Sequence, residues 1–399
     1  MTDFAPDFDA VIERLVAIQP MAYVHTRAHL DGALTRLSPY LTHGFLSLPD
    51  LARELFHRHR IGVQHKLINE LGWREFFQHI QEHGGEEALF TPTHAGPIEE
   101  DGYSDVIPED VRFACTQVPA IDQAVRTLYL TGHLHHQARL WLASYLVHLR
   151  KVHWRVGAHW LYSHLLDGDL ASNALNWQLV AGVRGDKPYL FNADQVARYA
   201  PAEWHSAGTT IDNQEHFIEL VAHSRATLAQ VQRSEFGWEE PAVHTTAPAS
   251  AGCTAPDPDL VRGKSVWWVH PWHLAELPAQ LPPEMVVVAA LWAEPLAAHP
   301  WDERRWAFVT QRMRALTPHV WFGSEAELVG AFAQAREVHT VSHLRVPDWT
   351  EVRWWKQPLP RLFRRLDAPV ATFPQWWLQV NRQVRYLHQL VSLGKPRAA

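Results

Sequence analysis

The sequence predicts an all-helical part followed by a smaller α/β part with a doubly wound parallel sheet. Up to residue 236, apolar residues recur three and four positions apart, which is typical of helices that bury one face. After residue 263, short β-branched runs alternate with helical patterns, as expected of parallel strands covered by helices. Residues 237–263 are rich in Pro, Ala, Ser and Thr and lack periodicity, so we expect a linker between domains 1–236 and 264–399.

Within the first part, strand patterns are hard to find and six segments carry the helical pattern most clearly. These segments are residues 7–18, 47–59, 65–83, 120–132, 136–152 and 157–166. In the second part, strand-like runs cover 264–270, 284–294, 319–324 and 337–343, and helical patterns cover 302–316 and 325–335. Neither GxGxxG nor GxxxxGK[ST] occurs there, so the α/β part has no obvious nucleotide site.

Composition narrows the class of protein. The formal charge of −7 argues against a chain that coats nucleic acid non-specifically. No apolar run approaches the roughly 20 residues that cross a bilayer, and the start lacks the basic and apolar regions of a secretory signal, so we expect a cytoplasmic protein without a membrane partner. The only cysteines, Cys115 and Cys253, exclude a disulfide framework and a Cys-based zinc site. The 19 tryptophans suggest stacking or electron transfer, although core packing explains most tryptophans in proteins.

Five polar islands interrupt the helical part. They are residues 33–44, 68–77, 132–146, 152–160 and 167–178. Each places one or two charges or amides beside aromatic residues on an expected helix. A buried charge must be paired, so five such islands in one domain indicate a shared internal cavity for a polar, partly charged ligand.

Each island also has a simpler interpretation. The "DGD" at 167–169 is often a helix N-cap with a turn, or the metal-binding DxD of a glycosyltransferase, although the latter should follow a strand. His133, His135 and His136 resemble a zinc site, but no carboxylate or cysteine stands at ligand spacing, so we expect no metal. Trp73 alone on an apolar helix face would be a core residue.

The order and spacing of the islands decide between these interpretations. "TRLSPYLTHG", "NELGWREFF", "GHLHHQARLWLASYL" and "DGDLASN" are together similar to the FAD-binding helical domain of the DNA photolyase and cryptochrome family, over roughly residues 20–205. The chain looks closest to atypical bacterial photolyase-like members. In that family an α/β antenna domain usually comes first, so the sheet domain here resembles a circularly permuted antenna domain. Whether it holds a second, antenna chromophore stays open.

The resemblance implies a U-shaped FAD and assigns its binding residues. These are Tyr23, Thr35, Arg36, Leu37, Ser38, Arg74, His136, Arg139, Asp167, Asp169 and Asn173. Hydroxyls and backbone N–H groups at 35–38 suit the diphosphate. Arg139 and Asp167 correspond to a pair beside the isoalloxazine ring, and Asn173 to the residue that faces flavin N5. An amide there favours a flavin that can be held fully reduced, which leans towards repair.

The resemblance also implies a pocket for a UV-damaged base pair flipped out of DNA. Glu70 and Trp73 correspond to its carboxylate and its stacking tryptophan. His136 stands where enzymes for cyclobutane dimers usually carry Asn, and Leu140 and Leu179 replace a Met and a second Trp. The neighbouring His135 makes this stretch similar to the histidine pair of (6-4) photolyases and animal cryptochromes. The lesion type therefore stays open.

Photoreduction is the second chemistry that the resemblance implies. Trp177 and Trp154 correspond to the two inner tryptophans of the chain that carries electrons to the flavin. The outer member is not evident, and Tyr103, Trp141 and Trp160 are the candidates.

Three functions compete on this reading. We favour a light-driven DNA repair lyase; the alternatives are a cryptochrome-like blue-light photoreceptor without repair and a redox flavoprotein without light chemistry. Residues 352–399 carry nine Arg or Lys against the single acid Asp367, with interleaved aromatics, which indicates a nucleic-acid surface or, equally, solvated arginines over a tryptophan core. The oligomeric state cannot be read from the sequence.

Overall fold

The computed structural model describes residues 4–185, 187–229 and 237–393, which form two compact units. The helical unit consists of Gln19–Leu34 and Gly84–Ala242. The sheet unit consists of Met1–Ile18, Thr35–His83 and Val243–Ala399, so it includes several helices from the first part of the sequence. Among the described residues, no helix has the length and apolar character that crossing a bilayer requires.

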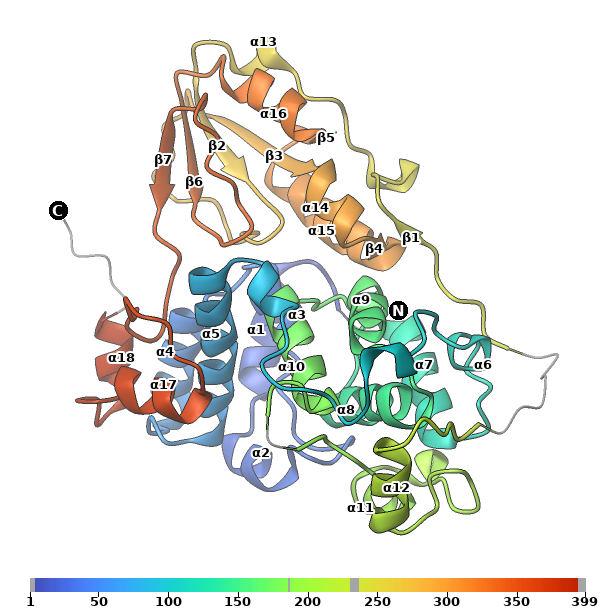
Figure 1. Ribbon diagram of the computed structural model, residues 1–399. Coiled ribbons are helices and arrows are strands. Elements are labelled where there is room, and N and C mark those ends of the chain that lie inside the picture. The colour runs from blue at the N-terminus through green and yellow to red at the C-terminus, as the bar shows by residue number, and fades with distance from the viewer. Residues whose placement is uncertain (1–3, 186, 230–236, 394–399) are drawn as a thin grey trace. The chain divides into compact units, whose positions relative to one another are not determined.

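The helical unit contains only helices and loops in its described residues (Figure 1). Its α-helices are α2 (Pro20–Thr26), α6 (Glu109–Arg112), α7 (Pro119–Thr131), α8 (His136–Ser144), α9 (Trp154–His164), α10 (Leu170–Ala181), α11 (Ala193–Tyr199) and α12 (Glu215–Ala222). Short 3-10 turns η1 (Glu87–Leu89), η2 (Glu100–Gly102) and η4 (Ala202–Trp204) connect them. The prediction of helices in this region is confirmed.

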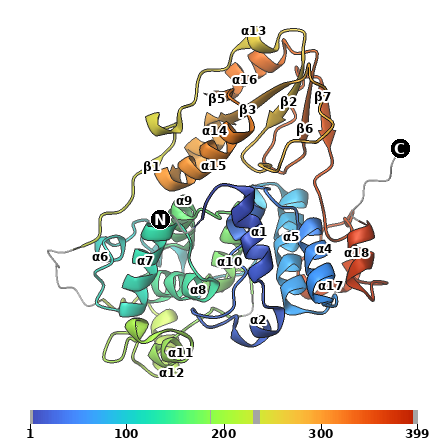
Figure 2. The same cartoon turned by 180° about the vertical axis from the view of Figure 1, so that it is seen from behind.

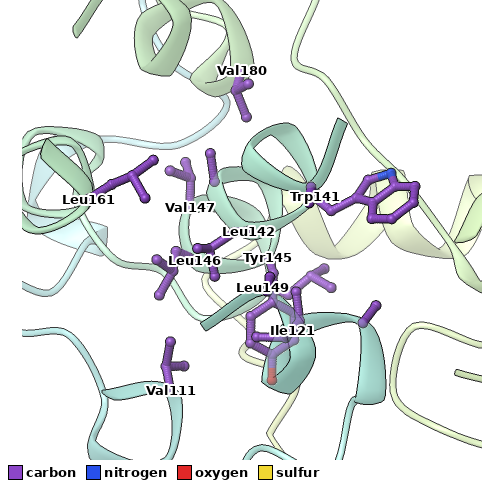
Figure 3. Packing of buried hydrophobic residues seen from close by; sticks show 14 of the residues in the cluster. Val111, Ile121, Trp141, Leu142, Tyr145, Leu146, Val147, Leu149, Leu161 and Val180 are labelled. Atoms are coloured by element: carbon purple, nitrogen blue, oxygen red, sulfur yellow. The ribbon is translucent and has the colours of Figure 1, made fainter. Parts of the chain in front are cut away.

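The core of the helical unit is built around α8. Figure 3 shows Trp141, Leu142 and Leu146 projecting from this region, with Ile121 of α7 and Val180 of α10 close by. All five side chains are buried, and burial of such apolar groups is the main stabilising contribution to a helical fold. The core therefore fixes the helices that carry the polar islands 132–146, 152–160 and 167–178.

The helix predicted over 136–152 changes its geometry after Ser144 and ends at Leu149. After α8 the chain forms one π turn, η3 (Tyr145–Leu149), and Lys151 then takes a left-handed φ of 54°. The buried Lys151 ammonium donates to the carbonyls of Val221 (2.7 Å) and Ala222 (3.2 Å) at the end of α12, which supply the partners that a buried charge needs. Such wider turns inside helices are often associated with functional sites.

The sheet unit holds the predicted parallel sheet. Its strands are β2 (Ser265–Val269), β3 (Val286–Trp292), β5 (Val320–Gly323), β6 (Glu337–Val341) and β7 (Trp354–Gln357), in the order β5-β3-β2-β6-β7. All neighbours are parallel; Val266, for example, lies opposite Val286 on one side and Val338 on the other. The four predicted strands are confirmed, and β7 is an additional strand at the edge.

Helices connect the strands of this sheet (Figure 1). α14 (Ala293–Ala298) and α15 (Glu303–Leu316) join β3 to β5, and α16 (Glu325–Phe332) joins β5 to β6. These two connections run in opposite directions across the sheet, so the right-handed crossover rule puts them on opposite faces. The strand order and these crossovers make a doubly wound sheet.

The remaining elements of the sheet unit come from both ends of the sequence. They are α1 (Phe8–Ala17), α3 (Ser38–Thr42), α4 (Leu48–His59), α5 (Lys66–Gly84), α17 (Phe373–Val380) and α18 (Leu387–Leu393). Both views place α17 and α18 beside α4 and α5 (Figure 2).

The expected linker at 237–263 is not without structure. It contains β1 (Val243–His244), the 3-10 turn η5 (Ala249–Ala251) and α13 (Pro258–Val261), and β1 pairs with β4 (Trp301–Asp302) in antiparallel fashion. Two-residue strands carry too little pattern to be recognised in a sequence.

Candidate functional site in the helical unit

An ion pair of the helical unit joins two of the predicted residues. The Arg139 guanidinium on α8 donates through Nη2 to both carboxylate oxygens of Asp167, at 2.9 and 2.8 Å, and through Nε to the carbonyl of Leu134 at 2.7 Å. The Asp167 side chain is only 4% exposed, and that of Arg139 is 23% exposed. The pair holds the guanidinium plane in one orientation, because three hydrogen bonds fix it.

Asp169 and Asn173 are held by the start of α10. Asp169 is the N-cap residue, and its Oδ1 accepts the backbone N–H of Ser172 at 2.8 Å, so the capping interpretation holds for this second acid of the "DGD". The Asn173 amide donates from Nδ2 to the carbonyl of Ala158 on α9 at 2.8 Å. That bond fixes the amide, so its Oδ1 is the acceptor that a ligand would meet. The Ser172 Oγ is buried and has no hydrogen-bond partner among the described residues.

The two histidines of "HLHHQAR" stand at the start of α8. His135 caps the helix by accepting the Gln137 N–H on Nδ1 at 2.9 Å. Burial lowers the pKa of both His135 and His136 to about 4, with Arg139 disfavouring the imidazolium further, so both rings are neutral at pH 7. Yet the His136 side chain is exposed.

Two buried tryptophans lie on α9 and α10, the helices that the Asn173 amide connects. Trp177 of α10 packs directly against Gly157 of α9, where a Cβ atom would lie 2.3 Å from the indole ring. Trp154, at the start of α9, stacks on Phe90 with ring centroids 6.4 Å apart. Trp177 and Trp154 are 2% and 3% exposed, so neither meets solvent directly.

An aromatic route leads outward from Trp154. Its ring stacks with His153 at 5.9 Å, and His153 in turn meets Tyr103 edge-on at 6.0 Å. Tyr103 is half-buried, and burial raises the pKa of its phenol to about 12. The other two candidates for an outer member face elsewhere: Trp141 stacks on Phe191 at 6.1 Å, and Trp160 donates to Glu240.

Glu240 is a residue that the sequence did not single out, because it falls in the expected linker. Its Oε1 accepts from Trp160 Nε1 at 2.8 Å and lies 3.0 Å from His164 Nε2, and its Oε2 accepts from Arg112. Burial alone would raise the pKa of Glu240, but the hydrogen bonds from His164, Arg112 and Trp160 lower it overall. The carboxylate therefore ties residues 237–242 to α9.

Tyr23, also predicted, lies half-buried on α2 of the helical unit. The other predicted residues belong to the sheet unit. Arg36 takes a left-handed φ of 51° just before α3, which begins at the half-buried Ser38. The Leu37 side chain is fully buried, so this residue could reach a ligand only through its backbone. Thr35 is half-buried in the same loop.

Three predicted residues lie on α5. Arg74 donates from Nη2 to Thr42 Oγ1 at 2.8 Å, which connects α5 to α3. Glu70 is exposed, whereas Trp73 is half-buried and stacks on Phe373 of α17, with centroids 3.9 Å apart and ring planes 10° apart. The contact with Phe373 could not be expected from a motif, because 300 residues separate the two rings.

Comparison with known proteins identifies the class of this domain. Residues 67–238 match the family model described as the FAD binding domain of DNA photolyase. Residues 67–238 therefore form an FAD-binding domain of the photolyase type, and relatives that are similar over this region are named cryptochrome or photo-lyase.

Several relatives are similar over this region. Cryptochrome DASH of Natronomonas pharaonis is 32% identical over 227 residues, which cover 54% of this chain and 47% of the relative. The chloroplastic/mitochondrial cryptochrome DASH of Ostreococcus tauri is 33% identical over 187 residues, covering 45% of this chain and 34% of the relative. The deoxyribodipyrimidine photo-lyase of Streptomyces griseus is 33% identical over 172 residues, with coverage of 42% and 36%. The chain spans less than half the length of each of these relatives.

Among solved structures, a bacterial class III photolyase from Agrobacterium tumefaciens is 25% identical, with a TM-score of 0.41 and coverage of 54% of both chains.

The described residues fit the cofactor that this domain implies. A fixed guanidinium at Arg139, an oriented amide at Asn173 and a buried, unpartnered hydroxyl at Ser172 are polar groups of the kind that recognise a flavin ring edge.

Proposed function

We propose that this protein binds FAD and uses blue light to repair UV-damaged DNA. The observation that carries the proposal is the Asn173 amide, which the Ala158 carbonyl holds at 2.8 Å. Asn173 stands on α10, shortly after the Asp167 that pairs with Arg139, in the sequence motif expected for such an enzyme. Bound FAD in its reduced form supplies an electron donor that blue light excites.

The proposed role of the protein's own side chains is to orient the cofactor and to keep the charges around it paired. Asp167 neutralises Arg139, so the guanidinium can stand beside the flavin without leaving an unpaired buried charge. Asn173 does not titrate, so its amide offers the same acceptor at every pH. Asp169 fixes the start of α10 and hence the position of Asn173. Tyr23, Arg74 and residues 35–38 are the proposed partners of the rest of the cofactor.

We assign the transfer of electrons to the flavin during photoreduction to the buried aromatic residues. Trp177 and Trp154 are the proposed inner members, and the stacked ring of His153 extends the path to the half-buried Tyr103. This order is preferred because Trp141 and Trp160 are engaged with other groups.

UV-damaged DNA is the proposed substrate. Glu70 and Trp73 on α5 are assigned to it, the first as an exposed carboxylate and the second as a ring on which an unstacked base can lie. The neutral His136 is a third candidate, because its exposed ring can donate or accept a hydrogen bond at pH 7. Which lesion is repaired is left to the experiment.

A blue-light photoreceptor without repair activity is the second candidate function. One observation favours it: Phe373 already stacks on Trp73, on which a lesion would have to lie. In that case the flavin and the tryptophans would retain their light chemistry while DNA repair is lost.

The sheet part has a proposed role of its own. Its doubly wound order supports an antenna-like domain that follows the FAD-binding helices in the sequence, as in a circular permutation. A second absorbing chromophore in the purified protein would support this role, and a spectrum of FAD alone would contradict it.

A paired measurement tests the main proposal. The purified protein is illuminated with blue light and a reductant while its flavin spectrum is recorded, and the reduced protein is then incubated with UV-irradiated oligonucleotide in light and in darkness. Restored pyrimidines in the light alone support a photolyase, and the product that disappears identifies the lesion. Photoreduction without repair supports the photoreceptor instead. A protein that binds no flavin contradicts both.

A further inference from the structure

A segment from the C-terminal part of the chain covers one side of α5. We call residues 361–377 the strap; it ends in the first turns of α17, which lies beside α5 in Figure 2. Three polar side chains of α5 hold the strap, and two aromatic rings of the strap pack on the same helix. The arrangement lies entirely within the sheet unit.

The polar anchors bind the strap backbone and its arginines. Glu75, which is 3% exposed, accepts the N–H groups of both Leu362 and Phe363, the second at 3.1 Å. His79 Nε2 accepts the N–H of Val370 at 3.1 Å.

The third anchor is ionic. Glu82 pairs with Arg361 and with Arg365, each at 2.9 Å. Glu82 also forms a group of potential metal ligands with His79 and His83, but the two guanidinium groups make this position unfavourable for a cation.

The aromatic contacts are close. Phe373 lies flat on Trp73 at 3.9 Å, and its side chain is buried. One turn away, the Trp377 ring approaches Gly72 so closely that a Cβ atom there would lie 2.4 Å from it. Glycine is therefore the residue that lets the strap approach α5 at this point.

We propose that Phe373 is a specificity-determining residue of the DNA site, because it covers one face of the Trp73 ring, which is the proposed platform for an unstacked base. The inference rests on the proposed function. A base can stack on an indole only at an uncovered face, so a damaged base that uses the face under Phe373 must first displace that ring. The strap, held at three polar anchors, sets how readily that displacement occurs.

The test compares the full-length wild-type protein with Phe373→Ala and with Leu378→Ala. Leu378 is the matched control, because it lies on the same helix and its side chain is 72% exposed. The affinity for a fluorescent single-stranded oligonucleotide with one thymine dimer, and for the undamaged oligonucleotide, is measured in darkness by anisotropy. We expect Phe373→Ala to bind the damaged strand about tenfold more tightly, the effect of one additional base stack. Leu378→Ala should match the wild type.

Glu75→Gln is a second variant in case Phe373→Ala does not fold. It replaces the carboxylate that accepts two strap N–H groups by an amide with a single acceptor, so the strap should loosen while Phe373 stays. It should also bind damaged DNA more tightly.

The outcomes separate this proposal from the proposed function. If wild type repairs DNA in light but a folded Phe373→Ala binds damaged DNA no more tightly, the role of Phe373 is overturned and the proposed function stands. Weaker binding by Phe373→Ala would also overturn it, because the ring would then be part of the platform. If all variants bind flavin but none prefers damaged DNA or repairs it, the proposed function fails, and this inference with it.

Discussion

Arg139 and Asp167 form a partly buried ion pair in which one guanidinium nitrogen lies 2.9 and 2.8 Å from the two carboxylate oxygens. The pair has two roles. It links α8 to the loop before α10, and it is the group that we assign to the flavin. Its neighbour Asp169 performs a different task, the capping of α10. The two acids of "DGD" can therefore be separated by mutation.

We expect Asp167→Asn to lower the free energy of unfolding by about 2 kcal/mol, because Arg139 keeps its charge and loses its counterion in a mostly buried position. The protein should also lose flavin more readily on dialysis. Asp169→Asn should change stability by less than about 0.5 kcal/mol, because Asn is nearly as good an N-cap as Asp. Urea unfolding of both variants checks this, and equal losses would contradict the separate roles.

The packing of Trp177 on Gly157 allows a second prediction. Gly157→Ala would place a methyl group 2.3 Å from the indole, so we expect a loss of about 1–3 kcal/mol from overpacking. Gly330→Ala is the control: this glycine is also helical, but a Cβ atom there meets nothing within 4 Å, so the substitution should stabilise by about 0.5–1 kcal/mol. Thermal unfolding distinguishes the two, and a neutral Gly157→Ala would contradict the close contact.

The third prediction concerns the aromatic route. Trp154→Phe should slow light-driven flavin reduction by about tenfold or more, since phenylalanine is a far poorer electron donor than an indole. Trp141→Phe is the matched control, because Trp141 is also a buried indole but stacks on Phe191 rather than on the route to Tyr103. Reduction rates per bound flavin are compared under the same illumination. Similar slowing in both variants would place the path elsewhere.

Parts of the site and of the fold could be predicted from the sequence. The family resemblance paired Arg139 with Asp167, and the structure shows the contact between these two residues. The cofactor contacts of the other site residues stay predictions. The β-branched runs likewise predicted β2 and β3. β7 was missed because its residues, Trp354–Gln357, belong to an edge strand whose alternate side chains are exposed, among basic and aromatic residues that resemble a surface segment.

Long-range contacts account for the rest. Glu240 lies in a stretch with linker composition, and its role depends on Trp160 and His164, which are some 80 residues earlier. In the same way, only the folded chain brings Phe373 to Trp73. No local period or motif encodes such pairs, because their sequence neighbours do not take part in the contact.

The last prediction concerns the strap and pH. Burial raises the pKa of Glu75 to about 7 in the folded protein, despite the N–H groups of Leu362 and Phe363 that lower it, whereas the ordinary value is 4.5. Because the folded pKa lies above the unfolded one, the stability contributed by Glu75 is fully present below pH 4.5 and is lost as the pH rises through 7. Glu75→Gln cannot titrate and should not show this loss.

We therefore expect wild type to lose on the order of 3 kcal/mol of unfolding free energy relative to Glu75→Gln between pH 4.5 and pH 8. Burial lowers the pKa of the neighbouring His79 to about 4, but His79 is present in both proteins, so its titration largely cancels in the comparison. Glu70→Gln, on an exposed position of the same helix, controls for the loss of a carboxylate from α5. Urea unfolding at both pH values measures the difference. Parallel pH profiles for wild type and Glu75→Gln would mean that the carboxyl is ionised throughout, held by the strap N–H groups more strongly than burial opposes them.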